Sequence, residues 1–164
     1  MKKIALCGFM GCGKTTVANE LSQSFNLNHI DTDKYIEEKA CRSITEIFGS
    51  DGEAFFRQLE HEAICQLSQN SNCVLSLGGG AVMFENNLNV LKQNGYQIVF
   101  INTDFDVIKN RLSYDNTRPL LKSNDIKALY DIRLEKYKNA CDIEIICTDH
   151  SAHDIAKMII DKTK

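Results

Sequence analysis

The chain has 164 residues, a formal net charge of −3 and 43% hydrophobic residues. This length suits a single domain over residues 1–164, and neither a basic cluster nor an apolar run of about 20 residues is present to predict binding to nucleic acid or a membrane. None of the seven cysteines forms a C-x-x-C pair, which favours free thiols in a reducing cytoplasm over disulfides or a zinc site.

Residues 8–15, with the sequence GFMGCGKT, match the phosphate-binding P-loop pattern G-x-x-x-x-G-K-[ST]. The apolar run 4–7 predicts a buried strand before the loop, and apolar residues every four positions after it predict a helix. In this context backbone N–H groups and the helix N-terminus converge on phosphate oxygens. We therefore expect a nucleoside triphosphate to bind here, with Lys14 on its β- and γ-phosphates and the Thr15 hydroxyl on Mg²⁺.

A weak strand over 27–30 runs into the D-T-D sequence at 31–33, and helical sequence follows through residue 40. Carboxylates at the end of such a strand lie where ligands of open α/β sheets bind. One carboxylate can support the water shell of a metal ion while the other holds a nucleophilic hydroxyl. The alternative is that Asp33 only caps a helix that begins near Lys34.

Two helices are expected next in the chain. Ser43 and Glu46 form a capping-box pattern that opens a short helix toward Gly49, and Asp51 is predicted to cap the following helix. That second helix carries Arg57, which taken alone is compatible with a solvated surface charge.

The second half of the chain continues the alternation of strands and helices. A strand over 73–77 ends in glycines 78–80, which form either a flexible turn or a place where a small ligand can approach the backbone. The polar stretch 113–124 has no regular periodicity and predicts a mobile lid. The other predicted elements are strands over 96–101 and 143–147, helices over 86–93, 104–112 and up to about 139, and a closing helix. Together these segments predict a three-layer α/β fold with a five-stranded parallel sheet.

The P-loop alone does not separate kinases from GTPases and ATPase motors. The chain has no N-K-x-D run to recognise guanine, and its third strand ends in glycines rather than in the acidic residue that a motor ATPase uses for Mg²⁺. The chain length and the polar stretch around Arg118 instead indicate a small-molecule kinase with a lid.

Six motifs resemble those of the shikimate kinase family, in the family's order and at its usual intervals. They are GFMGCGKTT at 8–16, DTD at 31–33, FRxxE at 56–60, SLGGG at 76–80, RPLL at 118–121 and RxxxY at 133–137. The resemblance covers essentially the whole chain. It implies a P-loop kinase that transfers the γ-phosphoryl group of ATP to the 3-hydroxyl of shikimate with Mg²⁺, on the route to chorismate and the aromatic amino acids. We expect a cytoplasmic monomer.

On the acceptor side, the resemblance implies contacts from helices over about 33–70 and from residues farther along. Asp33 would hold the substrate's hydroxyls and accept or orient the proton, while Arg57 and Arg133 would clamp its carboxylate. Planar, bidentate arginines suit a carboxylate better than lysines do. The glycines implied in closing this pocket are Gly78, Gly79 and Gly80.

On the nucleotide side, the resemblance implies that Lys14 and a lid arginine, Arg118, contact the transferred phosphoryl group. Asp31 would support Mg²⁺ through water beside Thr15, and Arg111 would pack on the adenine. The other residues implied in ATP binding are Gly11, Cys12, Gly13 and Thr16.

Two other functions remain open at this point. A related small kinase could act on gluconate or on a nucleoside monophosphate, although Arg57 and the glycine triplet favour a compact carboxylate. A nucleotide-binding module without catalysis is the second alternative. Such a module need not retain the residues on which transfer depends, namely Lys14, Thr15, Asp31, Asp33 and Arg118.

Overall fold

A parallel five-stranded sheet forms the centre of the computed structural model, which describes residues 1–114 and 123–164. Its order is β2-β3-β1-β4-β5, and all four neighbouring pairs run parallel. The strands are β1 (Lys3–Cys7), β2 (Asn28–Asp31), β3 (Cys73–Ser76), β4 (Gln97–Asn102) and β5 (Ile143–Ile146). The predicted α/β fold with five parallel strands is confirmed, and the carboxyl ends of all the strands lie at one edge.

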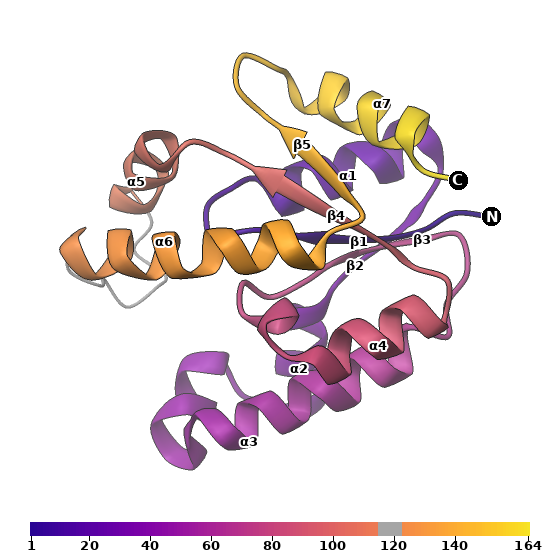
Figure 1. Cartoon of the computed structure of the whole chain (residues 1–164). Helices are drawn as coiled ribbons and strands as arrows, with labels where there is room; N and C mark the ends of the chain where they lie inside the picture. Colours follow the sequence, from indigo (N-terminus) through magenta and orange to yellow (C-terminus); the bar gives the residue numbers. More distant parts are fainter. Residues whose placement is uncertain (115–122) are drawn as a thin grey trace.

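Helices cover both faces of the sheet (Figure 1). On one face lie α1 (Lys14–Phe25) and α7 (Ala152–Lys162); on the other lie α4 (Glu85–Gln93) and α6 (Ser123–Ala140), with α5 (Phe105–Ser113) beside α6. The central strand β1 is covered on both sides, and the side chains of Ile4, Ala5 and Leu6 are fully buried. This accounts for the uninterrupted apolar run in that part of the sequence.

Helices α2 (Thr32–Ala40) and α3 (Ile44–Leu67) pack against each other beside β2 and have a small core of their own, formed by Ile36, Ile47, Phe56 and Ala63. The capping box predicted for the start of α3 is present. The predicted break between two helices is a kink inside α3 at Gly52, which has φ 84°. Asp51 was predicted to cap the second helix, but its carboxylate pairs with Arg42 at 2.7 Å.

The junction of β2 and α2 decides what the two aspartates of the D-T-D sequence do. Asp31 is the N-cap of α2, because its side chain accepts a hydrogen bond from the backbone N–H of Lys34 at 3.1 Å. The helix therefore begins at Thr32 rather than near Lys34, and Asp33 lies in its first turn. The capping role considered for Asp33 belongs to Asp31 instead.

One predicted segment falls outside the described residues. Arg118, its motif at 118–121 and most of the expected lid over 113–124 are in the part of the chain that the structure does not describe. Within the described part, no helix is long and apolar enough to cross a membrane.

Candidate active site

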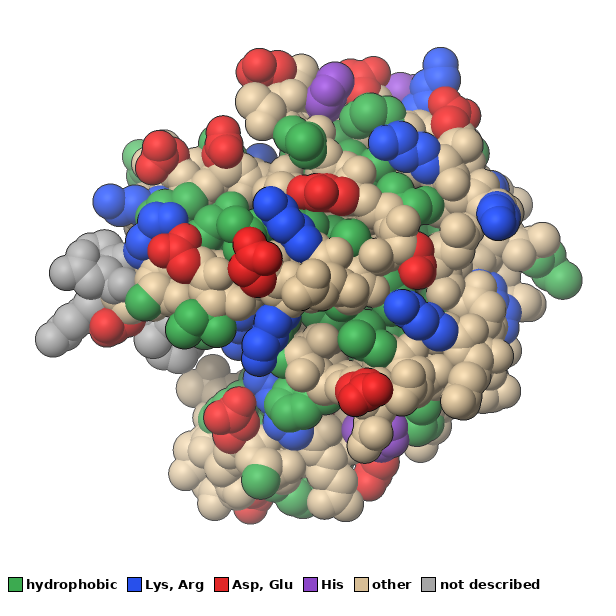
Figure 2. Space-filling model, in the orientation of Figure 1, with side chains coloured by type: hydrophobic (Ala, Val, Ile, Leu, Met, Phe, Trp, Pro, Cys, Tyr) green, Lys and Arg blue, Asp and Glu red, His purple; other side chains and the backbone are tan. Residues whose placement is uncertain are grey.

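A pocket of about 1350 Å³ lies at the carboxyl edge of the sheet, between the P-loop and the α2–α3 pair. Ligands of open parallel sheets bind at this edge. In Figure 2 basic side chains gather where the surface is hollowed between α6 and α3. The pocket brings together the predicted site residues that the structure describes, which are Gly11, Cys12, Gly13, Lys14, Thr15, Thr16, Asp31, Asp33, Arg57, Gly78, Gly79, Gly80, Arg111 and Arg133.

The P-loop makes a tight turn from β1 into α1, and two of its glycines are required by geometry. Gly13, the N-cap of α1, has φ 101°, a left-handed conformation that side-chain-bearing residues rarely adopt. A Cβ on Gly8 would lie 2.7 Å from Cys12 Sγ and 2.9 Å from the Ile101 carbonyl oxygen. The loop is thus closed on itself and exposes backbone N–H groups at the helix N-terminus, a favourable place for phosphate.

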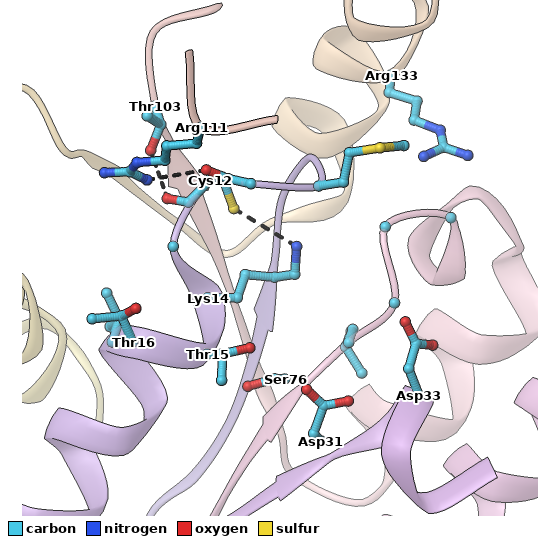
Figure 3. Close-up of a pocket in the computed structure, with 18 of the residues that line it drawn as sticks. Cys12, Lys14, Thr15, Thr16, Asp31, Asp33, Ser76, Thr103, Arg111 and Arg133 are labelled. Atoms are coloured by element: carbon cyan, nitrogen blue, oxygen red, sulfur yellow. Dashed lines mark hydrogen bonds between the residues drawn. The ribbon is translucent and has the colours of Figure 1, made fainter. Parts of the chain in front are cut away.

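Lys14 folds back over this loop (Figure 3). Its Nζ donates hydrogen bonds to the carbonyl oxygens of Gly8 at 2.7 Å and Phe9 at 3.2 Å, and it lies 3.7 Å from Cys12 Sγ. The partners of the ammonium group are therefore neutral, and an arriving phosphate can replace them with a stronger, charge-assisted contact.

Thr15, Asp31 and Ser76 place oxygen atoms on the same side of the pocket (Figure 3). Hydroxyl and carboxylate oxygens suit Mg²⁺, which takes few protein ligands and obtains the others from phosphates and water. The residues present therefore fit a Mg²⁺ ion that accompanies ATP. Among the described residues, no group of three or more His, Cys, Asp or Glu that could hold a metal ion occurs.

Glycines at the end of β3 allow the acceptor-side residues to come close to the backbone. A Cβ on Gly78 would lie 2.7 Å from Asp33 Oδ1, and a Cβ on Gly80 would lie 2.5 Å from Arg57 Nη2. Such separations are far below van der Waals contact, so any side chain here would displace the carboxylate or the guanidinium. The glycine triplet is consequently a close-approach segment and not merely a flexible turn.

Thr32 fastens α2 to this glycine segment. Its fully buried hydroxyl donates to the Ser76 carbonyl oxygen at 3.2 Å and accepts a hydrogen bond from the Gly78 N–H at 3.1 Å. The Gly78 N–H is therefore engaged inside the protein. Because Asp33 is the next residue along α2, this pair of bonds also fixes the distance between Asp33 and the glycines.

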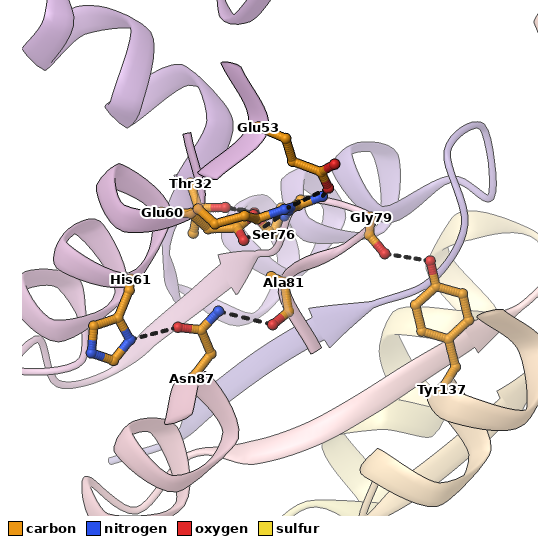
Figure 4. Close-up of polar contacts among 11 residues, drawn as sticks. Thr32, Glu53, Glu60, His61, Ser76, Gly79, Ala81, Asn87 and Tyr137 are labelled. Atoms are coloured by element: carbon orange, nitrogen blue, oxygen red, sulfur yellow. Dashed lines mark hydrogen bonds and ion pairs between the residues drawn. The ribbon is translucent and has the colours of Figure 1, made fainter. Parts of the chain in front are cut away.

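The guanidinium of Arg57 is held in place by rings and carboxylates. It lies 5.2 Å from the ring centroids of both Phe56 and Phe84. It also pairs with Glu60 at 2.9 Å and with the more exposed Glu53 at 3.5 Å; Figure 4 labels both glutamates. Arg57 thus faces the pocket with part of its charge already compensated, and its side chain is only 17% exposed, unlike that of a solvated surface arginine.

Glu60 is the most deeply buried ionisable group beside the pocket, with a side chain that is 1% exposed. Burial raises the pKa of this carboxyl to about 7, and the nearby Asp33 carboxylate adds to the rise, while Arg57 and Arg133 oppose it. Its Oε1 atom accepts the hydrogen bond from Arg57. Its Oε2 atom is buried and has no hydrogen-bond partner among the described residues.

Helix α6 supplies the side of the pocket opposite α3. The Nη1 atom of Arg133 would lie 3.2 Å from a Cβ on Gly79, and its guanidinium carbon lies 5.9 Å from the centroid of the Phe9 ring. One turn further along, the Tyr137 hydroxyl donates to the Gly79 carbonyl oxygen (Figure 4). The RxxxY motif therefore contributes both a pocket cation and an anchor for the glycine segment.

Arg111 on α5 lies against the P-loop. Its Nη1 atom donates to the Gly11 carbonyl oxygen at 3.0 Å and would be 3.4 Å from a Cβ on Gly13. Thr16, exposed in the first turn of α1, also lines the pocket. The proposed contact of Arg111 with adenine stays a prediction.

Among the residues of this site that received no role from the sequence are Glu60, Thr32 and Phe84. Glu60 lies three positions after Arg57, a spacing that places both on one helix face and could have indicated their ion pair. Thr32 and Phe84 gave no usable signal, because their contacts join segments that only the fold brings together.

Comparisons with known proteins agree on one family. The model of the shikimate kinase family matches residues 10–164. A curated shikimate kinase from Caldicellulosiruptor saccharolyticus is 43% identical over 149 residues, covering 88% of this chain and 86% of that protein. Another, from Sulfurihydrogenibium sp., is 38% identical over 166 residues, covering 100% of this chain and 99% of that protein. The solved structure of shikimate kinase from Acinetobacter baumannii in complex with shikimate matches with a TM-score of 0.90 at 32% identity, over 98% of this chain and 92% of that chain.

Proposed function

The chain belongs to the shikimate kinase family and is an ATP-dependent phosphotransferase, and from that premise we propose how its residues transfer the γ-phosphoryl group of ATP to the 3-hydroxyl of shikimate. The observation that supports the assignment best is a single pocket with two unlike walls. One wall is the P-loop, and the other carries Asp33 with the two arginines Arg57 and Arg133.

The nucleotide occupies the P-loop wall. Lys14 leaves the loop carbonyls and follows the transferred phosphoryl group, where its charge stabilises the transition state. Thr15 and Asp31 would hold Mg²⁺, Asp31 through water, and the bound ion would supply charge neutralisation at the phosphates. The resemblance assigns Arg118 to the same phosphoryl group from a lid, and Arg111 to the adenine.

The acceptor occupies the other wall. Arg57 and Arg133 clamp the shikimate carboxylate, because planar guanidinium groups match a carboxylate in two parallel hydrogen bonds. This clamp turns the ring so that its 3-hydroxyl faces Asp33, which accepts or orients the proton while the phosphoryl group is transferred in line. Gly79 and Gly80 let the substrate lie directly against the backbone. The close approach that these glycines already allow to the arginines supports this placement.

We further propose that one domain over residues 1–164 carries both walls and acts as a cytoplasmic monomer. One chain supplies all the described residues of the two walls. The acceptor-side region over about 33–70 and the lid over about 113–124 are then the parts that meet the two substrates.

The test is ADP release from Mg-ATP by the purified chain over a panel of acceptors. We expect shikimate to be phosphorylated at its 3-hydroxyl and quinate, gluconate and nucleoside monophosphates to give little ADP above the background. The position of the new phosphate is read by ³¹P–¹H NMR. A preference for gluconate or for a nucleotide acceptor would overturn the proposal.

A further inference from the structure

Two acidic side chains of the acceptor wall lie close together beside Gly78. Glu60 is nearly fully buried, and its Oε2 atom would lie 3.1 Å from a Cβ on Gly78, on which Asp33 Oδ1 also converges. Two carboxyl groups therefore share the space above one glycine. The proposed clamp then brings a third carboxylate, that of the substrate, into the same place.

The described charged groups around this space come from three helices. Among the described residues, the cations that face it are Arg57 from α3 and Arg133 from α6. The described anionic groups are Asp33 from α2 and Glu60 from α3, with the more exposed Glu53 also paired to Arg57. A shikimate carboxylate on Arg57 adds a negative charge close to the buried Glu60, and two like charges so placed repel each other.

Protonation of Glu60 relieves this repulsion. Its Oε1 atom holds Arg57 Nη1 at 2.9 Å, so it competes directly with a substrate carboxylate for the same guanidinium. A proton on the Oε2 atom, which has no hydrogen-bond partner among the described residues, removes the negative charge of Glu60 and weakens its hold on Arg57.

We propose that Glu60 takes up a proton from solvent when the shikimate carboxylate binds Arg57, so that acceptor binding is coupled to protonation of this one buried carboxyl. The inference rests on the proposed function, since it takes shikimate as the ligand of Arg57. In it, Glu60 is a positioning residue, because it acts on the substrate through Arg57.

The direction of the pH dependence follows from linkage. In the free protein the pKa of Glu60 is about 7, and the bound carboxylate raises it further. Well below pH 7 the carboxyl is protonated in both states, so binding takes up no proton and the affinity does not change with pH. Above about pH 7 the affinity falls by up to tenfold per pH unit, until the pKa of the complex is reached.

Isothermal titration calorimetry of shikimate binding without nucleotide tests this inference. Titrations at about pH 8 in phosphate and in Tris, two buffers with different ionisation enthalpies, give the number of protons taken up. We expect uptake approaching one proton per shikimate at about pH 8 and near zero at about pH 5.5. Binding without proton uptake at about pH 8 would overturn the inference and leave the proposed function intact. No binding at either pH would overturn the proposed function and the inference with it.

Two glutamine variants separate proton coupling from structural support. Glu60→Gln keeps the shape and an acceptor for Arg57 but cannot ionise, so we expect no proton uptake, an affinity independent of pH, and tighter binding than wild type at about pH 8. Glu53→Gln is the matched control, because Glu53 also pairs with Arg57 but its side chain is 66% exposed. That variant should retain the proton uptake. If Glu60→Gln bound shikimate more weakly at every pH, Glu60 would have only a structural role. If shikimate binding to Glu60→Gln still took up a proton, the proton would belong to another group, and the inference would be overturned.

Discussion

The two walls of the pocket are built in different ways. The nucleotide wall is one continuous segment, residues 8–15, whose contribution comes mainly from backbone groups at the start of α1. The acceptor wall is assembled from side chains on α2, α3 and α6 around the glycines that follow β3. The residues of the nucleotide wall are therefore neighbours in the sequence, whereas those of the acceptor wall come together only when the chain folds.

The walls also differ in how their cations are held before a ligand arrives. Lys14 is bonded to neutral carbonyl groups, so a phosphate that replaces them makes a better contact than the one it breaks. Arg57 is paired with Glu60 and Glu53, so a substrate carboxylate must compete with existing carboxylates. The acceptor wall is therefore the part of the site at which charge compensation, and hence pH, should govern affinity.

The largest effect should come from Asp33→Asn, which removes a charge from the acceptor wall and keeps the shape. If Asp33 accepts or orients the hydroxyl proton, kcat should fall by about 10²–10⁴-fold. Shikimate affinity should fall less, because the arginine clamp remains. Helix capping cannot account for such a loss, since Asp31 caps α2. Steady-state kinetics and a melting curve check both points, and a kcat within a few-fold of wild type would exclude Asp33 from the chemistry.

Lys14→Ala tests the opposite wall, and the expected loss in kcat is about 10²–10³-fold, the cost of removing one preorganised group that stabilises transition-state charge. Shikimate binding without nucleotide should be unchanged, because the hydrogen bonds of Lys14 to described residues all go to the loop. Lys157→Ala, an exposed lysine on α7, serves as the control. A near wild-type rate for Lys14→Ala would contradict the P-loop assignment.

The sequence predicted these two walls to different extents, for physical reasons. The P-loop, the strands and the capping box at Ser43 follow from short-range patterns and were found directly. Arg57 and Arg133 could be placed in one site only through resemblance to a family, because no local pattern joins α3 to α6. The sequence could not decide which of the two aspartates caps α2, because both positions hold the same good capping residue, and only the backbone at the end of β2 makes Asp31 the cap.

Gly80→Ala should produce a smaller loss that is confined to the acceptor wall. Its φ of −100° suits alanine, so the effect is steric: the added Cβ would lie 2.5 Å from Arg57 Nη2 and 2.8 Å from Nη1. Displacing a charge-assisted contact costs about 1.5–3 kcal/mol, so shikimate should bind about 10- to 100-fold more weakly while ATP affinity is unchanged.

Gly49→Ala is the control for this prediction, because a Cβ there meets nothing within 4 Å. Calorimetry with each ligand separates the two walls. Equal losses for shikimate and for ATP in Gly80→Ala would mean that the glycine supports the fold and not the acceptor wall.

The smallest effect should follow Cys12→Ser, which tests whether Cys12 contributes to the nucleotide wall through its backbone and not through its thiol. The backbone of Cys12 is well anchored: its N–H donates to the Phe9 carbonyl oxygen at 3.1 Å and its carbonyl oxygen accepts from the Thr103 hydroxyl at 2.8 Å. Its thiol is buried and has one weak contact, at 3.7 Å from Lys14 Nζ. Serine keeps both backbone bonds and fits the same space.

We therefore expect the kcat and the KM for ATP of Cys12→Ser to stay within about fivefold of wild type, because one weak hydrogen bond contributes about 1 kcal/mol at most. Steady-state kinetics with ATP varied at saturating shikimate checks this. A loss well beyond tenfold would show that the thiol itself holds Lys14 in position. The nucleotide wall would then depend on a side-chain contact, as the acceptor wall does, and the contrast between the two walls would no longer hold.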